Sequence, residues 1–184
     1  MTSRHAACLI PLLLPLLAVG AAPDQPSAVV IPSDSPLVAI RVVFNAGSEC
    51  DPKGKEGLAA LTAAMLAEGG TKTLSYEQVL EKLYPMAAAV SGACRKEVTV
   101  FSGEVHRDNL DKYKSLLVEA ITSPRFDPAD FERLRNDALD YLSKSLRGGN
   151  DEELGKWTLQ LSLYPDHPYG HVDLGTIDGL KSIT

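Results

Sequence analysis

The sequence predicts an α+β fold, in which an antiparallel sheet carries its helices packed on one face. Short segments rich in β-branched residues predict strands, and longer segments whose apolar residues recur at helical spacing predict helices. Their order is one strand, two helices, two strands and three helices, which favours an antiparallel sheet over a regular alternation of strand and helix. The 184 residues, 45% hydrophobic and 23% charged, are sufficient for one globular domain with a hydrophobic core.

The first 22 residues have the composition of a secretory signal peptide. Arg4 and His5 precede an apolar run from Ala6 to Val19, and small residues follow at 20–22. The run is too short to span a bilayer comfortably, and it contains two prolines. We therefore expect an exported chain, periplasmic or extracellular, with no stable membrane span after cleavage of residues 1–22.

The mature chain is expected to begin with an extended segment and one strand. Residues 23–36 contain four prolines and are expected to form an extended lead-in to a domain at 37–184. Residues 37–45 are rich in β-branched side chains and predict a strand. The polar residues 46–56, with two glycines, predict a loop.

Two helices are expected next. Residues 57–68 have strong helix propensity and end at a Gly-Gly pair; their apolar stripe consists of Leu58, Leu61 and Met65. Ser75 and Gln78 form a capping-box pattern for a second helix, which Pro85 ends.

Two strands and three helices complete the predicted order. The strands are expected at 86–93 and 96–105, with a turn at Gly92–Arg95. One helix is expected at 108–122, and a long helix from Asp127 or Pro128 to about residue 146. A last helix, capped by Asn150, continues to Pro165; Trp157 is expected in the core with Leu154 and Leu161.

Five segments, in this order, resemble the insulinase (pitrilysin) family of zinc peptidases. From Val42 the chain reads VVFNAGSECDPKGKEGLAALTAAMLAEGGTKT, which is similar to the first strand and active helix of that family. The other four are the paired strands at 93–104, the tetrapeptide SPRF at 123–126, the run FERLR at 131–135 and the run LYPDHPYG at 163–170. The resemblance covers about residues 37–184 and implies the N-terminal half domain of the family, incomplete at its C-terminus.

The residues that hold zinc in active members of this family are replaced here. Active members carry an H-x-x-E-H motif on the helix: two His ligands one helical turn apart and a Glu that acts as general base on the zinc-bound water. The matching positions are Ala60, Ala63 and Ala64, and the third ligand, a downstream Glu, falls on or beside Tyr141. Asp140 and Glu68 offer only two distant carboxylates. We therefore expect no catalytic residue, no metal ligand and no cofactor.

The resemblance implies a non-catalytic homologue, because the family's framework is retained while the ligands are lost. Its expected role is a peptide-binding or assembly partner of a zinc-bearing peptidase subunit, with an extended peptide held by strand addition to a sheet edge. The face that contains Ala59, Ala60, Ala63, Ala64 and Ala67 is either simple close packing or the apolar wall of a former active site. The alternative function is an active zinc metalloendopeptidase with a displaced metal site.

Other candidate residues give weaker signals. Cys50 and Cys94 could form a disulfide in an exported chain, contributing about 4 kcal/mol in the chain-entropy model, or they could be two unpaired core residues. His167 and His171 are four apart, but Pro168 and Gly170 between them predict a turn rather than a helical metal site. No serine has a G-x-S-x-G context. The net charge of −6 argues against a nucleic-acid partner.

Overall fold

The computed structural model describes residues 27–184, and its folded unit comprises Ser35–Thr184. The predicted signal peptide at 1–22 lies outside the described residues. Residues 27–34 form neither helix nor strand. Among the described helices, none combines the length and the apolar character that crossing a membrane requires.

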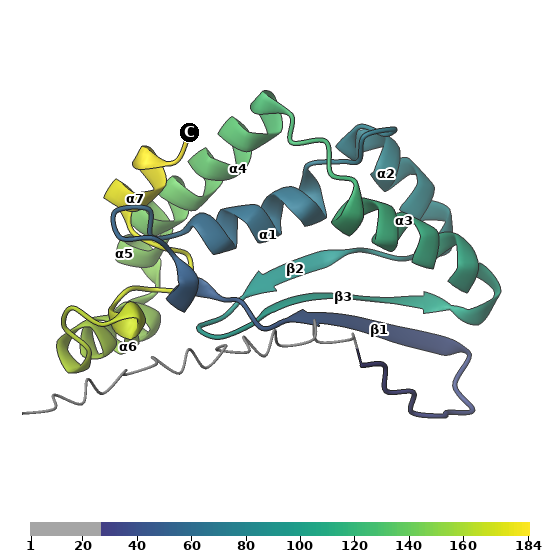
Figure 1. Cartoon of the computed structure of the whole chain (residues 1–184), viewed down its shortest axis with the longest axis horizontal. Coiled ribbons are helices and arrows are strands. Elements are labelled where there is room, and N and C mark those ends of the chain that lie inside the picture. The colour runs from purple at the N-terminus through teal and green to yellow at the C-terminus, as the bar shows by residue number, and fades with distance from the viewer. Residues whose placement is uncertain (1–26) are drawn as a thin grey trace, which may run out of the picture. The chain divides into compact units, whose positions relative to one another are not determined.

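The sheet has three antiparallel strands in the order β1-β3-β2, as Figure 1 shows. β1 is Leu37–Phe44, β2 is Ser91–Cys94 and β3 is Thr99–His106. Along β1 the side chains of Val38, Ile40 and Val42 are partly buried, and those between them are exposed. This alternation places one face of the sheet under the helices and confirms the predicted α+β class.

The turn between the second and third strands is not at Gly92–Arg95, as the sequence predicted. Residues 84–86 form a 3₁₀ turn, Gly92 lies inside β2, and the strands reverse at residues 95–98. A Cβ added to Gly92 would lie 2.7 Å from the carbonyl oxygen of Ala63. Gly92 therefore permits the close approach of a helix to the sheet rather than a turn.

Within residues 27–184, seven α-helices follow or flank the strands. They are α1 Leu58–Glu68, α2 Tyr76–Leu83, α3 Leu110–Thr122, α4 Pro128–Asp140, α5 Leu146–Gly149, α6 Asp151–Leu163 and α7 Ile177–Ser182. The capping box of Ser75 and Gln78 is confirmed, and Asp127 and Asn150 cap α4 and α6 through their side chains. In Figure 1, α1, α2 and α3 lie on the same side of the sheet.

The long helix predicted to run to about residue 146 is interrupted by a π-helical segment at Tyr141–Ser145. In an unbroken α-helix, Leu146 would point about 120° away from Leu134. Because a π turn advances less per residue, the segment returns Leu146 towards the face of Leu134. Leu134, Leu142 and Leu146 are all buried in one cluster.

α1 separates two hydrophobic clusters. On the sheet side, Ala63 and Ala67 join Phe101, Val105 and Tyr113 in the first cluster. On the other side, Leu61 and Met65 join the cluster built from α4 to α7. α6 contributes less than predicted: Leu161 is 49% exposed, although Leu154 and Trp157 pack on the second cluster.

Candidate functional site

The loop before α1 fixes the start of this helix. The Asp51 carboxylate accepts hydrogen bonds from the backbone N–H groups of Gly57 (2.6 Å) and Ala59 (2.8 Å). Gly57 has a φ of 111°, and a Cβ there would lie 2.7 Å from the carbonyl oxygen of Leu174. A carboxylate at a helix N-terminus satisfies free N–H groups and interacts favourably with the helix dipole. Asp51 and Gly57 thus orient the helix that would carry the metal motif.

The three motif positions on α1 face different surroundings. Ala63 is 2% exposed and belongs to the sheet-side cluster. Ala64 is partly buried against the α4–α7 cluster, and Ala60, one turn earlier, is also partly buried. A methyl group has no lone pair, so none of the three side chains can coordinate a cation or accept a proton. Across residues 27–184, no group of three or more His, Cys, Asp or Glu side chains could hold a metal ion.

The other positions considered for metal ligands, Tyr141, Asp140 and Glu68, make contacts with other side chains. Tyr141, at the position of the expected third ligand, opens the π-helical segment and meets Trp157 edge to face, with ring centroids 6.3 Å apart. Asp140 pairs with Lys144 at 2.8 Å, and Glu68 lies 3.8 Å from Arg133. The π-helical segment escaped the sequence analysis because its i→i+5 bonding leaves no periodic signal over so few residues.

His167 and His171 each make a local contact with the backbone. His167 Nδ1 accepts a hydrogen bond from the backbone N–H of Tyr169, and the His171 ring lies beside its neighbour's carbonyl oxygen, that of Val172. His167 instead belongs to an aromatic cluster with Tyr164 and Tyr169, whose ring centroids are 5.1–5.8 Å apart. No sequence pattern predicts this cluster, because two tyrosines in a turn have no helical or strand spacing.

Tyr169 links this cluster to the β2–β3 turn. Its hydroxyl donates a hydrogen bond to the Glu97 carboxylate, and this bond raises the pKa of Tyr169 to about 12. Lys96, which precedes Glu97 in the turn, forms an ion pair with Asp173 at 3.1 Å. These contacts attach the segment after α6 to the sheet, so the fifth resembling segment has a structural role here.

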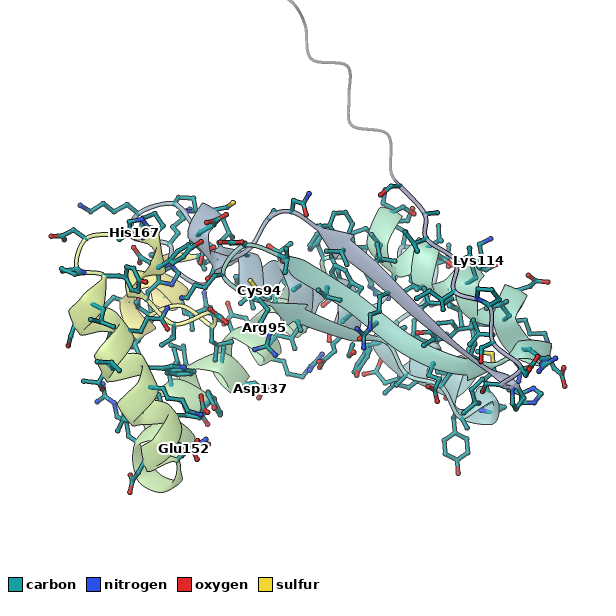
Figure 2. The ribbon with its side chains drawn as sticks, turned by 90° about the horizontal axis from the view of Figure 1, so that it is seen from below. Cys94, Arg95, Lys114, Asp137, Glu152 and His167 are labelled. Atoms are coloured by element: carbon teal, nitrogen blue, oxygen red, sulfur yellow. The ribbon has the colours of Figure 1, made fainter. Side chains whose placement is uncertain are left out.

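Cys50 and Cys94 are free thiols in this structure. Cys50 is exposed, whereas burial raises the pKa of the Cys94 thiol. Figure 2 shows Cys94 beside Arg95 near the end of β2. A bridge between Cys50 and Cys94, one of the two alternatives that the sequence leaves open, stays an expectation for the exported chain.

An apolar cavity of about 340 Å³ lies beside α1. Ala59 and Ala63 of the alanine-rich face line it, together with Phe44 and Phe101 of the sheet. The second feature of this region is β2, which pairs only with β3 among the described residues and lies against α1. A free strand edge presents backbone N–H and C=O groups that can pair with an added strand.

Comparison with known proteins gives a consistent result. Residues 28–146 match the family described as Insulinase (Peptidase family M16). The Helicobacter pylori protein named non-peptidase homolog YmxG is 26% identical over 148 residues, which are 80% of this chain and 34% of that protein. An uncharacterized zinc protease of Rickettsia bellii is 24% identical over 139 residues, 76% of this chain and 33% of that one.

Solved structures show the same fold. The peptidase M16 inactive domain from Pseudomonas fluorescens has a TM-score of 0.73 at 25% identity, covering 83% of this chain and 37% of that one. Pitrilysin has a TM-score of 0.68 at 23% identity, covering 80% and 16%. The chain spans about a third of the length of the curated relatives that it matches. This partial coverage is consistent with a half domain of the fold.

Proposed function

Because this chain belongs to the insulinase family, peptidase family M16, we propose that it is a non-catalytic member that binds extended peptides and assembles with a zinc-bearing peptidase subunit. The observation that carries the proposal is the replacement of the motif by Ala60, Ala63 and Ala64 on a helix that otherwise keeps its caps and its packing. The names of two similar proteins, one a non-peptidase homolog and one an inactive domain, support the absence of catalysis.

The chemistry of zinc supports the same conclusion. A catalytic zinc site needs three protein donors and an open position for water. The two imidazole positions hold methyl groups, and the third holds a phenol that packs on Trp157. The general base is also missing, because the position of its carboxylate holds the methyl group of Ala63, which is buried against the sheet.

The peptide-binding part of the proposal rests on β2 and the cavity beside α1. An extended peptide added along the free edge of β2 would gain backbone hydrogen bonds that do not depend on zinc. The apolar cavity lined by Phe44, Ala63 and Phe101 contains no residue of β2, and it would accept an apolar group of a bound ligand separately from this edge. We further propose export to the periplasm or the extracellular space, on the composition of residues 1–22.

Zinc content tests the loss of the metal site. Purified chain dialysed against zinc should contain almost no metal by elemental analysis, and zinc or a chelator should leave its melting temperature unchanged, because a ligand stabilises only a state that binds it. Stoichiometric zinc together with chelator-sensitive peptidase activity would instead establish the alternative, an active zinc metalloendopeptidase with a displaced site. The zinc protease names of two relatives are what favour that alternative.

A restored variant provides the positive control. Ala60→His, Ala64→His and Tyr141→Glu return the three ligands and leave the buried Ala63 unchanged, so that metal binding is tested without burying a carboxylate. This variant should retain more zinc than the wild type. Equal zinc contents in the two chains would show that the helix no longer presents these positions to one ion.

Co-purification tests the assembly role. The chain should elute with a zinc-bearing family subunit from the same source in size-exclusion chromatography. In β2, Cys94→Pro should weaken binding of an extended peptide by removing an N–H group of the free edge, because Cys94 lies between the hydrogen-bonded pairs that β2 forms with β3. A strictly monomeric chain that binds no such subunit would refute the assembly role.

A further inference from the structure

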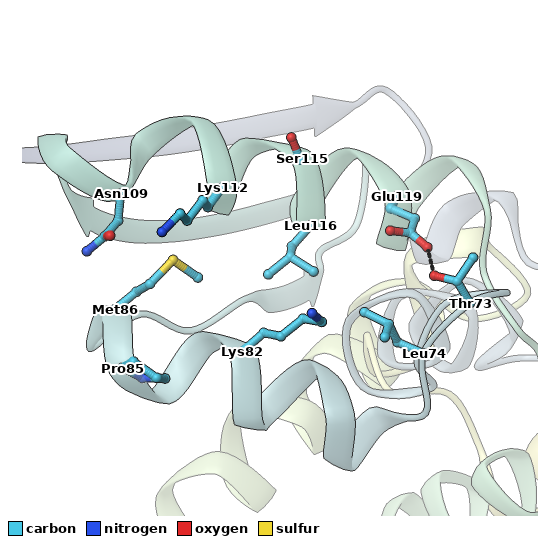
Figure 3. Close-up of a pocket in the computed structure, with 10 residues that line it drawn as sticks. All are labelled: Thr73, Leu74, Lys82, Pro85, Met86, Asn109, Lys112, Ser115, Leu116 and Glu119. Atoms are coloured by element: carbon cyan, nitrogen blue, oxygen red, sulfur yellow. Dashed lines mark hydrogen bonds between the residues drawn. The ribbon is translucent and has the colours of Figure 1, made fainter.

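A second groove lies between α2 and α3 and shares no residue with α1. Its volume is about 630 Å³, within the range of ligand sites in proteins. Figure 3 shows its walls: the loop before α2, the end of α2 with the turn after it, and α3 as far as Glu119.

The floor of this groove is apolar and held in place by the core. Met86 is buried, Leu74 and Leu116 are partly buried, and all three pack in the sheet-side cluster. A floor made by residues anchored from below offers a fixed surface for an apolar side chain. It does not need to form on binding, which limits the entropy cost.

Two lysines line this groove, one on each of its two helices. Lys82 belongs to α2 and Lys112 to α3, and both side chains are exposed. The lysine ion pairs found between residues 27 and 184 are those of Lys96, Lys144 and Lys156, so neither groove lysine forms a direct ion pair there. Lys82 is nevertheless near enough to Glu119 to interact with its carboxylate electrostatically. In a chain of net charge −6, the lining of this groove contains two lysines and one glutamate, and so carries a net positive charge.

One end of the groove is nevertheless acidic. The Glu119 carboxylate accepts hydrogen bonds from the hydroxyls of Thr71 and Thr73, which hold it at the end nearest Leu74. Lys112 and Asn109 lie towards the other end (Figure 3). A fixed carboxylate at one end disfavours a continuous anionic surface, such as a membrane or a nucleic acid, but it leaves room for a single carboxylate at the Lys112 end.

We propose that the groove between α2 and α3 binds an acidic, amphipathic peptide segment of a partner protein. An apolar side chain of this segment packs on Leu74, Met86 and Leu116, and a carboxylate meets Lys112 and Asn109. Lys82 supplies a second attractive charge, and Glu119 sets the direction of the segment by repelling its acidic end. This site is additional to the peptide edge of β2 and does not depend on it.

Two matched synthetic peptides test the proposal by nuclear magnetic resonance titration of the isotope-labelled chain. One is a short helix-forming peptide with leucines and two glutamates one turn apart, and the other has glutamine at both acidic positions. The acidic peptide should shift the amide signals of α2 and α3 and should bind more weakly as salt is added. The glutamine peptide should bind about tenfold more weakly.

Charge-reversal variants locate the site. Lys112→Glu should weaken binding of the acidic peptide about tenfold, whereas Lys114→Glu, on the same helix but outside the groove, should change it little. Equal binding of both peptides, or equal effects of the two variants, would overturn the proposal. The proposal would also be overturned if the chain bound neither peptide but bound anionic lipid vesicles in a way that Lys112→Glu abolished.

Discussion

Two glycines of this chain lie in opposite surroundings. At Gly103 in β3, an added Cβ would lie 1.7 Å from the hydroxyl oxygen of Tyr113 and 2.3 Å from the carbonyl oxygen of Ala89. These two oxygens are the partners of a partly buried hydrogen bond of 2.9 Å, donated by the tyrosine. At Gly155 in α6, nothing lies within 4 Å of an added Cβ. The same substitution should therefore have opposite effects at the two sites.

We expect Gly103→Ala to lower the free energy of unfolding by about 2–4 kcal/mol, because it overpacks the core and displaces the Tyr113 hydroxyl from its acceptor. Gly155→Ala, the matched control, should raise it by about 0.5–1 kcal/mol, because alanine has the higher helix propensity. Urea denaturation measures both. Loss of stability in both variants would show that α6 is packed more closely than its open surroundings indicate.

At the scale of elements, one carboxylate joins the loop after α1 to α3. Glu119 of α3 accepts hydrogen bonds from Thr71 and Thr73, and the loop also pairs with the chain after α3 through an isolated bridge between Thr71 and Pro124. The hydrogen bonds from Thr73 and Thr71 hold the pKa of Glu119 below its ordinary value of 4.5. The ionised form is thus the one that the folded chain favours.

This shift makes part of the stability depend on pH. A carboxyl group with a lowered pKa in the folded state contributes stability above its unfolded-state pKa, and this contribution is lost as the pH falls through the lower folded value. The difference in unfolding free energy between the wild type and Glu119→Gln should therefore be constant near neutral pH and shrink below about pH 4.5. Thr73→Val should reduce this pH-dependent part. A difference that stays constant down to pH 3 would contradict the coupling.

At the scale of the whole folded unit, α1 is shared by two hydrophobic clusters. Leu61 and Met65 pack towards α4–α7, and Ala63 and Ala67 pack towards the sheet. The two clusters should therefore unfold together, since disrupting α1 exposes both.

Met65→Ala tests this coupling. Met65 is 3% exposed, so the truncation should cost about 2–4 kcal/mol. Hydrogen exchange should then accelerate by a similar factor in β3, in the other cluster, and in α4. Leu159→Ala in α6, where the side chain is 59% exposed, should change exchange little. Faster exchange confined to α4–α7 would show two separate cooperative units.

Elements whose signals lie within a few consecutive residues could be predicted from the sequence. The strand at β1, the helix α1 with its glycine stop, the capping box of α2 and the Asp127 cap of α4 all match the structure to within two residues. That Ala60 and Ala64 cannot ligate a metal is equally a property of the sequence, because no fold can give their side chains a lone pair.

Only the tertiary structure decided where distant segments approach one another. The position of β2 depends on the close contact between Gly92 and Ala63. The π-helical segment brings Leu146 into the second cluster. The exposure of Leu161 depends on which parts of the chain pack against α6. The groove of Lys82 and Lys112 likewise joins residues from two helices whose spacing in the sequence carries no period. Local patterns encode backbone preference and amphipathic faces, whereas these features are set by packing between residues far apart in the chain.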